Sequence, residues 1–552
     1  MPTLFKFLLL SLFFYASTLF GAALSYQELK TKPKSIAKDY YIYRLLAETA
    51  NVTIEQAKTL YEQVSRMNGN LETLFEKKLG QNENKQKTFA CQKSAQKDLN
   101  FLNQECVKLL VHPPFVASLD SKSKTKLIKK LKNDNNSFAA GWAEAMSSKD
   151  IFTALKKKGA KEFLAVFNSM PQSYRKSHFD KKLNFDFIKL LEKEDGYEKF
   201  IKTIVIGEQN FSTLPKSLIY NSQNSSLSYN SYFFLGINAV KFKKTELAEK
   251  FFNEAEKKAY YKYDKDKAMF WQYLMNKNNE TLRRLSESHD VNIYSLYAKE
   301  AFDLPVLSAT FVTPSQNEPK ENFDMQDPFA WREFLDTIKN ISPDEAESLS
   351  EKFNSEQTLP IHAFLLERAM QYRRNYFIVP FGEYLADFDD ERKIVILSLA
   401  RQESRFVTST ISTSYALGMM QFMPFLARNI AKEQKIKNFD IDDMFKPEVS
   451  YKFANIHLDY LTKYLYHPLF IAYAYNGGIG FTKRMLQSNL FFKKGDYEPF
   501  LSMETIGYEE SREYGKKVLA NYIMYSKYFG KDISIKALLS ALIKPKETDK
   551  FR

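Results

Sequence analysis

The most informative stretch of the chain is DDERKIVILSLARQESRFVTSTISTSYALGMMQFMP, residues 389–424. Acidic residues open it and apolar residues recur every three or four positions, a pattern that predicts an amphipathic helix. The helix runs to Glu403, a Ser/Thr-rich loop follows at 408–414, and a second helix is expected from Pro424 onward. The pattern therefore places one carboxylate at the point where an apolar helix ends.

Glu403 is the candidate catalytic group of this stretch. A carboxyl that apolar neighbours partly remove from water has a raised pKa and stays protonated near neutral pH. A general acid that cleaves a glycosidic bond needs this property. The competing interpretation is an ordinary ion pair with Arg401 or Arg405. The apolar neighbours in the sequence are Phe406, Met419, Met420, Met423 and Phe425.

No second acid accompanies Glu403 in the local sequence. Between Glu403 and Asp440 the only other acid is Glu433, which lies in the next predicted helix. Glycosidases usually use two carboxylates, except where the substrate supplies the second group. An N-acetyl group beside the anomeric carbon can do so, and the sequence thus suggests an N-acetylated sugar polymer as substrate.

Two further polar islands follow. The first, AYAYNGGIG at 472–480, has three glycines that break a helix after Asn476, and Tyr475 and Asn476 suit stacking on and hydrogen bonding to a saccharide. The alternative is a helix C-cap with two core tyrosines. The second, ETIGYEESREY at 504–514, opens the last long helix, where acids also suit a helix N-terminus without any function.

Together the three islands resemble the catalytic module of the soluble lytic murein transglycosylases, which has a goose-lysozyme-like fold. The resemblance covers about residues 380–529. This chain departs from the usual pattern at Met419, Gly477, Ile479, Gly507 and Ser511. The matching motifs are Glu403-Ser404, Ser412, Gly418-Met419-Met420-Gln421 with Met423-Pro424, Ala474-Tyr475-Asn476-Gly477-Gly478, and the set Glu504, Ile506, Tyr508, Glu510, Arg512 and Tyr514.

The resemblance implies a lytic transglycosylase, a carbon–oxygen lyase. Glu403 would protonate the bond between N-acetylmuramic acid and N-acetylglucosamine, and then act as a base while a 1,6-anhydro ring closes. The alternatives are a lysozyme-like muramidase that uses water, an inactive peptidoglycan-binding scaffold, and a helical-repeat interaction protein with an incidental enzyme. The substrate-binding residues implied by the resemblance are Ser412, Gly418, Met420, Gln421, Met423, Tyr475, Asn476, Glu504 and Glu510.

The rest of the chain reads as helix after helix. Only 17 glycines and 18 prolines occur in 552 residues, whereas all-β proteins use many Gly/Pro turns. The expected fold is all-α, with an N-terminal helical superhelix (solenoid), as in the long-form members of the family, followed by a lysozyme-like α-rich catalytic domain. The expected divisions are a signal peptide at 1–23, the superhelical domain at 24–312, linker helices at 313–379, the catalytic domain at 380–540 and a disordered tail at 541–552.

The N-terminus predicts export. Lys6 precedes an apolar run from Phe7 to Phe20, and small residues at 21–23 suit cleavage after Ala23. A membrane anchor is the alternative, but the run is shorter than the ~20 residues that a spanning helix needs. We therefore expect a soluble periplasmic protein. In that oxidising compartment Cys91 and Cys106 are expected to form a disulfide rather than two free thiols.

The net charge of +14 bears on which partners are expected. Peptidoglycan strands carry carboxylates, so a basic protein gains in the rate of encounter. An exported chain without a basic-aromatic reading motif is not expected to bind nucleic acid. The six histidines form no HExxH or HxxxH pair, and we expect neither a metal nor a cofactor. Cell-wall synthases are candidate partners, and the sequence does not fix the oligomeric state.

Overall fold

The computed structural model describes residues 24–207, 211–222, 224–315, 318 and 320–552. The predicted signal peptide, residues 1–23, lies outside the described residues. The all-α prediction is confirmed, because helices dominate and the only strands in the described residues are β1 (Ala309–Phe311) and β2 (Asn375–Phe377), which pair in parallel. None of the helices in these ranges is long and apolar enough to cross a membrane.

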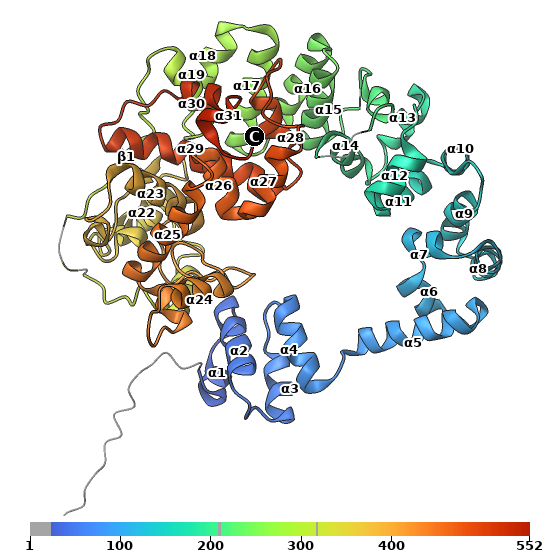
Figure 1. Ribbon diagram of the computed structural model, residues 1–552, viewed down its shortest axis with the longest axis horizontal. Helices are drawn as coiled ribbons and strands as arrows, with labels where there is room; N and C mark the ends of the chain where they lie inside the picture. The colour runs from blue at the N-terminus through green and yellow to red at the C-terminus, as the bar shows by residue number, and fades with distance from the viewer. Residues whose placement is uncertain (1–23, 208–210, 223, 316–317, 319) are drawn as a thin grey trace, which may run out of the picture.

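The N-terminal helices follow one another along a wide arc that Figure 1 shows in blue to green. Close packing explains the tight pairing of successive helices: a Cβ on Gly236 of α15 would lie 2.6 Å from the ring of Phe252 in α16. The helices are α1 (Tyr26–Thr31), α2 (Ile36–Glu48), α3 (Ile54–Glu62), α4 (Gly69–Leu79), α5 (Glu83–Lys97), α6 (Gln104–Leu110), α7 (Pro113–Ser118), α8 (Ser121–Asn133), α9 (Ser137–Met146), α10 (Ile151–Lys158), α11 (Ala160–Ser169), α12 (Gln172–Phe179), α13 (Phe185–Leu191), α14 (Tyr197–Val205), α15 (Tyr229–Lys241), α16 (Thr245–Lys258), α17 (Lys262–Asn276), α18 (Asn279–Ser286) and α19 (Ile293–Ala301), with 3-10 turns η1 (Leu99–Phe101) and η2 (Leu214–Leu218).

A disulfide joins α5 to α6 within this arc. Cys91 and Cys106 are bonded with their Cα atoms 5.2 Å apart, and both side chains are buried. The bond links two helices that the short turn η1 separates. A cross-link of this kind restricts the unfolded chain.

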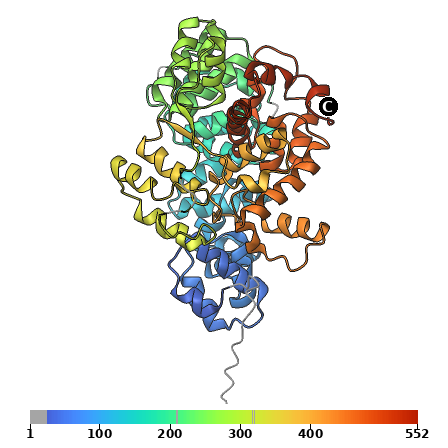
Figure 2. The same ribbon diagram turned by 90° about the vertical axis from the view of Figure 1, so that its left-hand side faces the viewer.

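Three helices connect the arc to the C-terminal module: α20 (Pro328–Thr337), α21 (Pro343–Ser350) and α22 (Leu359–Ala369). They have a small apolar core of their own, formed by Met325, Phe334, Ile338, Phe353, Ile361 and Leu365. Figure 2 shows these helices, in yellow, on the opposite side from the C-terminal helices in orange. The connecting segment is thus a packed unit.

The C-terminal module contains η3 (Gly382–Leu385), α23 (Asp390–Ser404), α24 (Pro424–Glu433), η4 (Ile441–Phe445), α25 (Pro447–Thr462), α26 (Pro468–Gly477), α27 (Ile479–Gln487), α28 (Phe500–Thr505), α29 (Glu509–Tyr528), α30 (Ile535–Ala541) and α31 (Pro545–Thr548). Helix α29 packs against both α23 and α26. A Cβ on Gly515 of α29 would lie 2.3 Å from the ring of Tyr473 in α26, so glycine lets these helices approach closely.

The prediction that residues 541–552 form a disordered tail is wrong. This segment contains α31 and folds back onto the module. Asp549 is buried and pairs with Arg552 at 2.8 Å, and the Arg552 guanidinium also donates to the carbonyl of Phe492 at 2.9 Å. The polar composition suggests disorder. In the folded chain, however, the charges of Asp549 and Arg552 neutralise each other, and the segment packs on the module.

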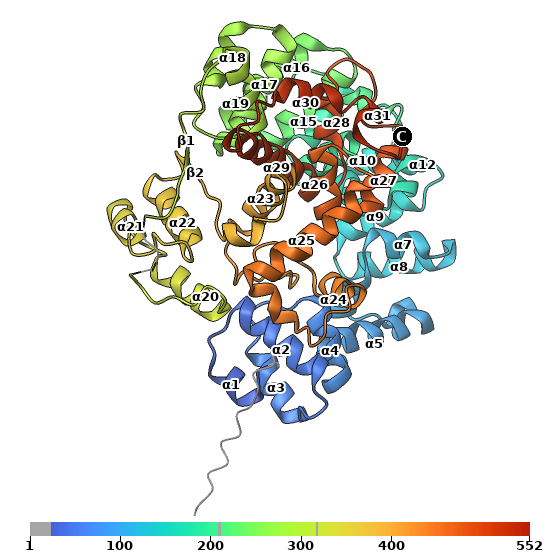
Figure 3. The ribbon, with the colours of Figure 1, turned by 60° about the vertical axis from the view of Figure 1, so that its left-hand side comes forward.

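The first helices of the described chain meet the part of the C-terminal module that contains α24 and η4. Figures 1 and 3 both show α24, in orange, beside the blue helices α2 and α4. Buried Arg44 of α2 pairs with Asp440 and Asp442 at the start of η4, at 2.8 Å in each case. The superhelix and the C-terminal module therefore form a closed ring.

Candidate active site

Helix α23 positions Glu403 near its C-terminal end. The Asp389 side chain caps the helix by accepting a hydrogen bond from the Arg392 amide, and the next residues bury an apolar face that includes Ile394 and Leu397. Arg405 adopts a left-handed conformation and ends the helix. The apolar face fixes the helix in the core, and Glu403 follows on its last turn.

The carboxyl of Glu403 is partly removed from water. Its pKa is raised to about 7: burial is the main cause, a hydrogen bond from Tyr514 partly opposes the rise, and the negative charge of Glu510 adds to it. In that hydrogen bond the Tyr514 hydroxyl donates to Glu403 Oε1 at 2.7 Å. Near neutral pH the group is thus poised between its acid and base forms, which suits general acid–base catalysis.

Arginines near Glu403 in the sequence do not neutralise it. Arg401 Nη2 donates to Glu367 Oε1 at 3.1 Å, and Arg405 forms an ion pair with the same carboxylate. Glu367 lies on α22 in the connecting helices. The interpretation of Glu403 as one half of an ordinary ion pair with Arg401 or Arg405 is therefore wrong.

Ser412, Gly418 and Gln421 shape the loop beside the acid. Ser412 Oγ accepts hydrogen bonds from the amides of two later loop residues. Gly418 has φ +73°, and a Cβ there would lie 2.0 Å from the carbonyl oxygen of Met444, so only glycine fits. Gln421 Nε2 donates to the carbonyls of Gly418 and Thr410 at 2.8 and 3.1 Å.

The methionines of this box have different placements. Met420 is fully buried, and its carbonyl accepts a hydrogen bond from the Tyr475 hydroxyl at 2.9 Å. Met423 is half-buried and borders a cavity. In this structure Met420 supports the apolar wall and Met423 reaches accessible space.

Tyr475, Asn476 and Glu510 lie around the acid. The charge of Glu403 raises the pKa of Tyr475, which burial has already raised. Asn476 Nδ2 donates to Glu510 Oε1 at 3.2 Å, and Asn476 Oδ1 accepts from Ser511 Oγ at 2.6 Å. The α26 island and the start of α29 thus meet at Glu403, as the motifs predicted.

Glu504 does not belong to this group. Its carboxylate is 2% exposed and accepts hydrogen bonds from Lys516 Nζ, at 2.8 Å, and from the hydroxyl of Tyr294 in the superhelix. Both oxygens are engaged in the interior. The expectation that Glu504 contacts the saccharide is therefore wrong, and its role here is structural.

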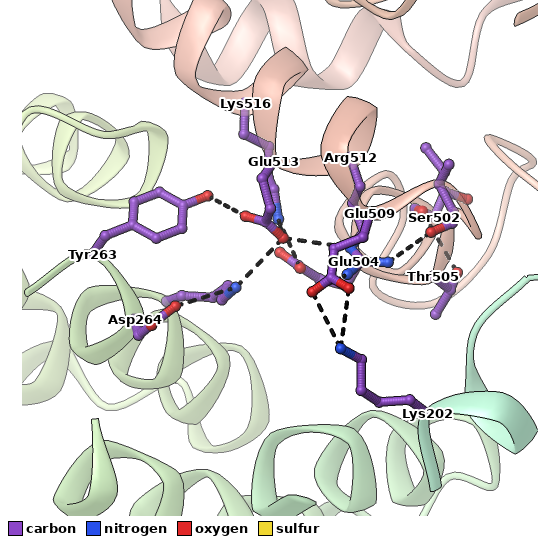
Figure 4. A network of polar contacts seen from close by, with 12 residues as sticks. Lys202, Tyr263, Asp264, Ser502, Glu504, Thr505, Glu509, Arg512, Glu513 and Lys516 are labelled. Carbon is purple, nitrogen blue, oxygen red and sulfur yellow. Dashed lines mark hydrogen bonds and ion pairs between the residues drawn. The ribbon is translucent and has the colours of Figure 1, made fainter. Parts of the chain in front are cut away.

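Glu504 belongs to a buried ion network that joins α29 to the superhelix (Figure 4). Tyr263 of α17 donates to Glu513 at 3.0 Å, and Lys516 donates to the same carboxylate at 3.1 Å. Lys267 of α17 approaches Glu513 at 3.7 Å. Burial alone would raise the pKa of Glu513, but the surrounding cations hold it below its usual range.

A cavity of about 440 Å³ adjoins Glu403. The end of α23, the exposed Lys517 of α29, and Tyr263 and Asn292 of the superhelix all line it. The acid therefore faces a space that the superhelix helps to build. Among the described residues, no three or more His, Cys, Asp or Glu side chains are grouped to hold a metal ion.

The sequence reasoning did not single out Tyr514 as a site residue. Its place in the last motif was the available signal, but the motif alone does not say that its hydroxyl reaches a carboxyl 111 positions earlier. The pairing depends on the way in which α29 packs against α23.

Comparisons with known proteins agree with this geometry. Residues 387–497 match the family model of the Transglycosylase SLT domain. The chain is 25% identical over 204 residues to the soluble lytic murein transglycosylase of Escherichia coli strain K12, a match that covers 36% of this chain and 31% of that protein. It is 28% identical over 225 residues to a putative soluble lytic murein transglycosylase of Haemophilus influenzae, with 37% of each covered.

The matches span about a third of the length of these curated relatives. The fold is similar along most of the chain to a solved structure, an inactive mutant of the lytic transglycosylase Slt from Pseudomonas aeruginosa, with a TM-score of 0.50 and 14% identity over 91% of this chain and 83% of that one. The resemblance that the motifs indicated is thereby confirmed.

Proposed function

We propose that this protein is a peptidoglycan lytic transglycosylase in which Glu403 serves first as acid and then as base. The observation that carries the proposal is the partly buried Glu403 carboxyl, whose pKa is raised to about 7 and which accepts a hydrogen bond from Tyr514. The SLT-domain match over residues 387–497 supports the same conclusion.

In the first step, protonated Glu403 gives its proton to the oxygen of the β-1,4 bond between N-acetylmuramic acid and N-acetylglucosamine. The bond breaks and the N-acetylglucosamine unit leaves with a hydroxyl group. The N-acetyl oxygen of the muramic residue stabilises the anomeric carbon, which accounts for the use of a single protein carboxylate.

In the second step, Glu403 is a carboxylate and takes the proton from the 6-hydroxyl of the same muramic residue. The 6-oxygen bonds to the anomeric carbon and displaces the N-acetyl oxygen. A 1,6-anhydro ring forms, water is not consumed, and Glu403 regains its proton. The Tyr514 hydrogen bond stabilises the carboxylate between the two steps.

The surrounding residues position the substrate. We assign Tyr475, Asn476 and Glu510 to the accessible wall and Met423 to an outer sugar contact. Ser412, Gly418, Met420 and Gln421 hold the loop and its apolar wall in place. The substrate and the net charge of +14 fit a soluble protein exported to the periplasm.

Glu403→Gln tests the assignment, because it keeps the shape of the side chain and removes the proton that is transferred. Turnover of purified sacculi should fall by at least about 10³-fold, while binding of glycan strands persists. Glu510→Gln is the matched control: it changes an exposed acid of the same site and should retain measurable turnover. Undiminished turnover by Glu403→Gln would contradict the assignment.

The same pair of variants distinguishes the proposed transglycosylase from the alternative, a muramidase that uses water. A hydrolase that activates water through Glu510 would lose its activity in Glu510→Gln as completely as in Glu403→Gln. A wild-type protein that binds strands but never cleaves them would instead be the inactive scaffold.

A further inference from the structure

Glu367 of α22 is a buried acid that the proposed reaction does not use. Three groups converge on its carboxylate. Arg401 Nη2 donates to Oε1 at 3.1 Å, the amide of Tyr376 donates to the same oxygen at 3.3 Å, and the Arg405 guanidinium forms an ion pair with it. The carboxylate therefore serves as the shared counter-charge of two cations on α23, the helix that carries Glu403.

The two arginines lie on either side of the acid in the sequence, and all three residues line the same cavity of about 440 Å³. Arg401 is buried, and its guanidinium lies over the ring of Phe377, 4.1 Å from the ring centre, which fixes its position. The Arg405 side chain is 43% exposed and has room to turn into the cavity. The carboxylates that line this cavity are Glu403 and Asp290.

An arginine paired with Glu403 would oppose the proposed chemistry. A cation close to a carboxyl favours the ionised form and lowers its pKa by about 1–3 units. The first step needs the protonated form, and a carboxylate held by a guanidinium is not free to meet the glycosidic oxygen. The pKa of Glu403 is instead raised to about 7, mainly by burial, and the group that opposes the rise is the Tyr514 hydroxyl rather than an arginine.

We propose that Glu367 is a positioning residue for the catalytic acid: it holds Arg401 and Arg405 so that neither guanidinium pairs with Glu403. Glu367 is buried and acts only through the arginines, without touching the substrate. Its place on α22 gives the connecting helices a part in the reaction besides joining the superhelix to the C-terminal module. The inference rests on the proposed function, because it concerns the same acid.

The other titratable groups around this site come from every element packed on it. The loop at 408–421 contains no charged residue, and its single tyrosine, Tyr415, is buried. Burial lowers the pKa of His457 of α25 to about 4, so its ring is neutral beside Tyr475. A substitution at Glu367 changes none of these groups. The remaining ones are Glu510, Tyr514, Lys517 and Tyr525 of α29, Tyr475 of α26, and Tyr263 and Asp290 of the superhelix.

The pH profile of kcat/KM for sacculi in Glu367→Gln tests the proposal. The amide keeps the size of the side chain and removes the charge that the two arginines share. Because Arg405 is then free to approach Glu403, the basic limb of the profile should move to lower pH by about 0.5–1 unit. Turnover at pH 7.5 should fall about three- to eightfold, and turnover at pH 5 should stay within about twofold of the wild type.

Three further variants separate this effect from a loss of structure. Glu367→Gln/Arg405→Gln also removes the guanidinium that is free to turn, so the basic limb should return toward its wild-type position although the double variant is no more stable. Glu367→Asp keeps the charge but withdraws it by one carbon, and should move the limb in the same direction by less. Asp39→Asn changes a buried acid of α2 that accepts from the amides of Ser65 and Arg66 at 2.8 Å and does not line the cavity, so it should lower stability without moving the profile.

An unmoved basic limb in folded Glu367→Gln overturns the proposal, as does an unmoved limb in Glu367→Asp where the amide variant does not fold. A double variant whose limb stays as far displaced as in Glu367→Gln also overturns it, because the effect is then structural. The proposed function fails separately: it fails if Glu403→Gln cleaves sacculi like the wild type. If Glu403→Gln is inactive and the profile of Glu367→Gln is unmoved, only the positioning role fails.

Discussion

Glu403 and Tyr514 form the pair on which the proposed chemistry depends. The Tyr514 hydroxyl stabilises the ionised carboxyl and therefore opposes the rise in pKa that burial causes. Near neutral pH both protonation states are accessible, and the proposed reaction uses one state in each step.

Tyr514→Phe removes the hydroxyl that donates to Glu403. Without this hydrogen bond the pKa of Glu403 should rise above about 7, because the burial that raises it persists. The basic limb of the kcat/KM profile should move to higher pH, and kcat should fall about tenfold or more because the carboxylate formed between the steps loses a donor. A pH–rate profile of purified protein measures both effects. An unshifted basic limb would show that the hydroxyl does not act on Glu403.

Glu403 also makes folding stability depend on pH. Its pKa is 4.5 when unperturbed and about 7 in the folded protein, so the folded state favours the protonated form. Its contribution to stability is fully present below pH 4.5 and is lost as the pH rises to about 7.

Glu403→Gln carries no charge at either pH and escapes this loss. Relative to the wild type, the free energy of unfolding of Glu403→Gln should therefore be greater at pH 8 than at pH 4, by up to about 3 kcal/mol. Urea unfolding of both proteins at pH 4 and pH 8 measures this difference in the free energy of unfolding. Equal differences at both pH values would mean that the pKa is not raised by folding.

Single residues could be assigned from the sequence where the chemistry was local. The apolar neighbours of Glu403 in the sequence predicted a carboxyl with a raised pKa, and burial does raise it, to about 7. The placement of Glu504 could not be predicted, because its partners Lys516 and Tyr294 come from two elements whose packing the sequence does not reveal.

At the scale of elements, α29 connects the acid to the superhelix. One side of the helix carries Ser511 and Tyr514, which contact Asn476 and Glu403. The other side carries the ion network, in which Lys267 of α17 approaches Glu513. The superhelix therefore fixes the orientation of the helix that holds the acid.

Lys267→Met removes a buried cation that faces α29. It should lower the free energy of unfolding by about 3 kcal/mol, since it leaves buried acids undercompensated. It should also raise the pKa of Glu403, because a positive charge is lost and Tyr514 is held less firmly. The pH profile of turnover, recorded below the unfolding temperature, detects this second effect.

Lys262→Met is the matched control for Lys267→Met. It changes a lysine of the same helix that pairs with buried Asp266 at 2.5 Å and has no contact with α29 among those found in the described residues. We expect it to lower stability without moving the pH profile. A profile that moves equally in both variants would refute the coupling through α29.

Elements with strong periodicity could be predicted from the sequence, but their packing could not. The helix ending at Glu403 and the helix break after Asn476 agree with α23 and with the end of α26 at Gly477. The segment after 541 is ordered where composition predicts disorder, because composition does not show that Arg552 binds the carbonyl of Phe492 across the folded chain.

For the whole molecule, the closed ring is the property that no local pattern indicated. Residues about 400 positions apart meet, as in the hydrogen bonds of Tyr40 and Tyr41 with Asp442 at 2.8 and 2.9 Å. Low glycine and proline content predicted helices. Closure depends on the small rotations between many successive helix pairs added together, and these rotations cannot be predicted from the sequence pattern.

Arg44→Met should open the ring. The change leaves Asp440 and Asp442 without a buried cation, and the loss is expected to be about 3–5 kcal/mol. Small-angle X-ray scattering should show a larger radius of gyration than in the wild type.

Arg332→Met is the control for ring opening. It breaks only an exposed pair with Asp336, worth less than about 1 kcal/mol, and should leave the scattering unchanged. An Arg44→Met protein as compact as the wild type would show that the apolar contacts between the first helices and the C-terminal module suffice for closure.

The most direct test of the central claim is mass analysis of the products released from purified sacculi in oxygen-18 water. If Glu403 alone supplies and removes the proton, every new muramic end is a 1,6-anhydro ring without the heavy oxygen. Reducing muramic ends that carry oxygen-18 would show that water attacks the anomeric carbon, and the transglycosylase account would be wrong.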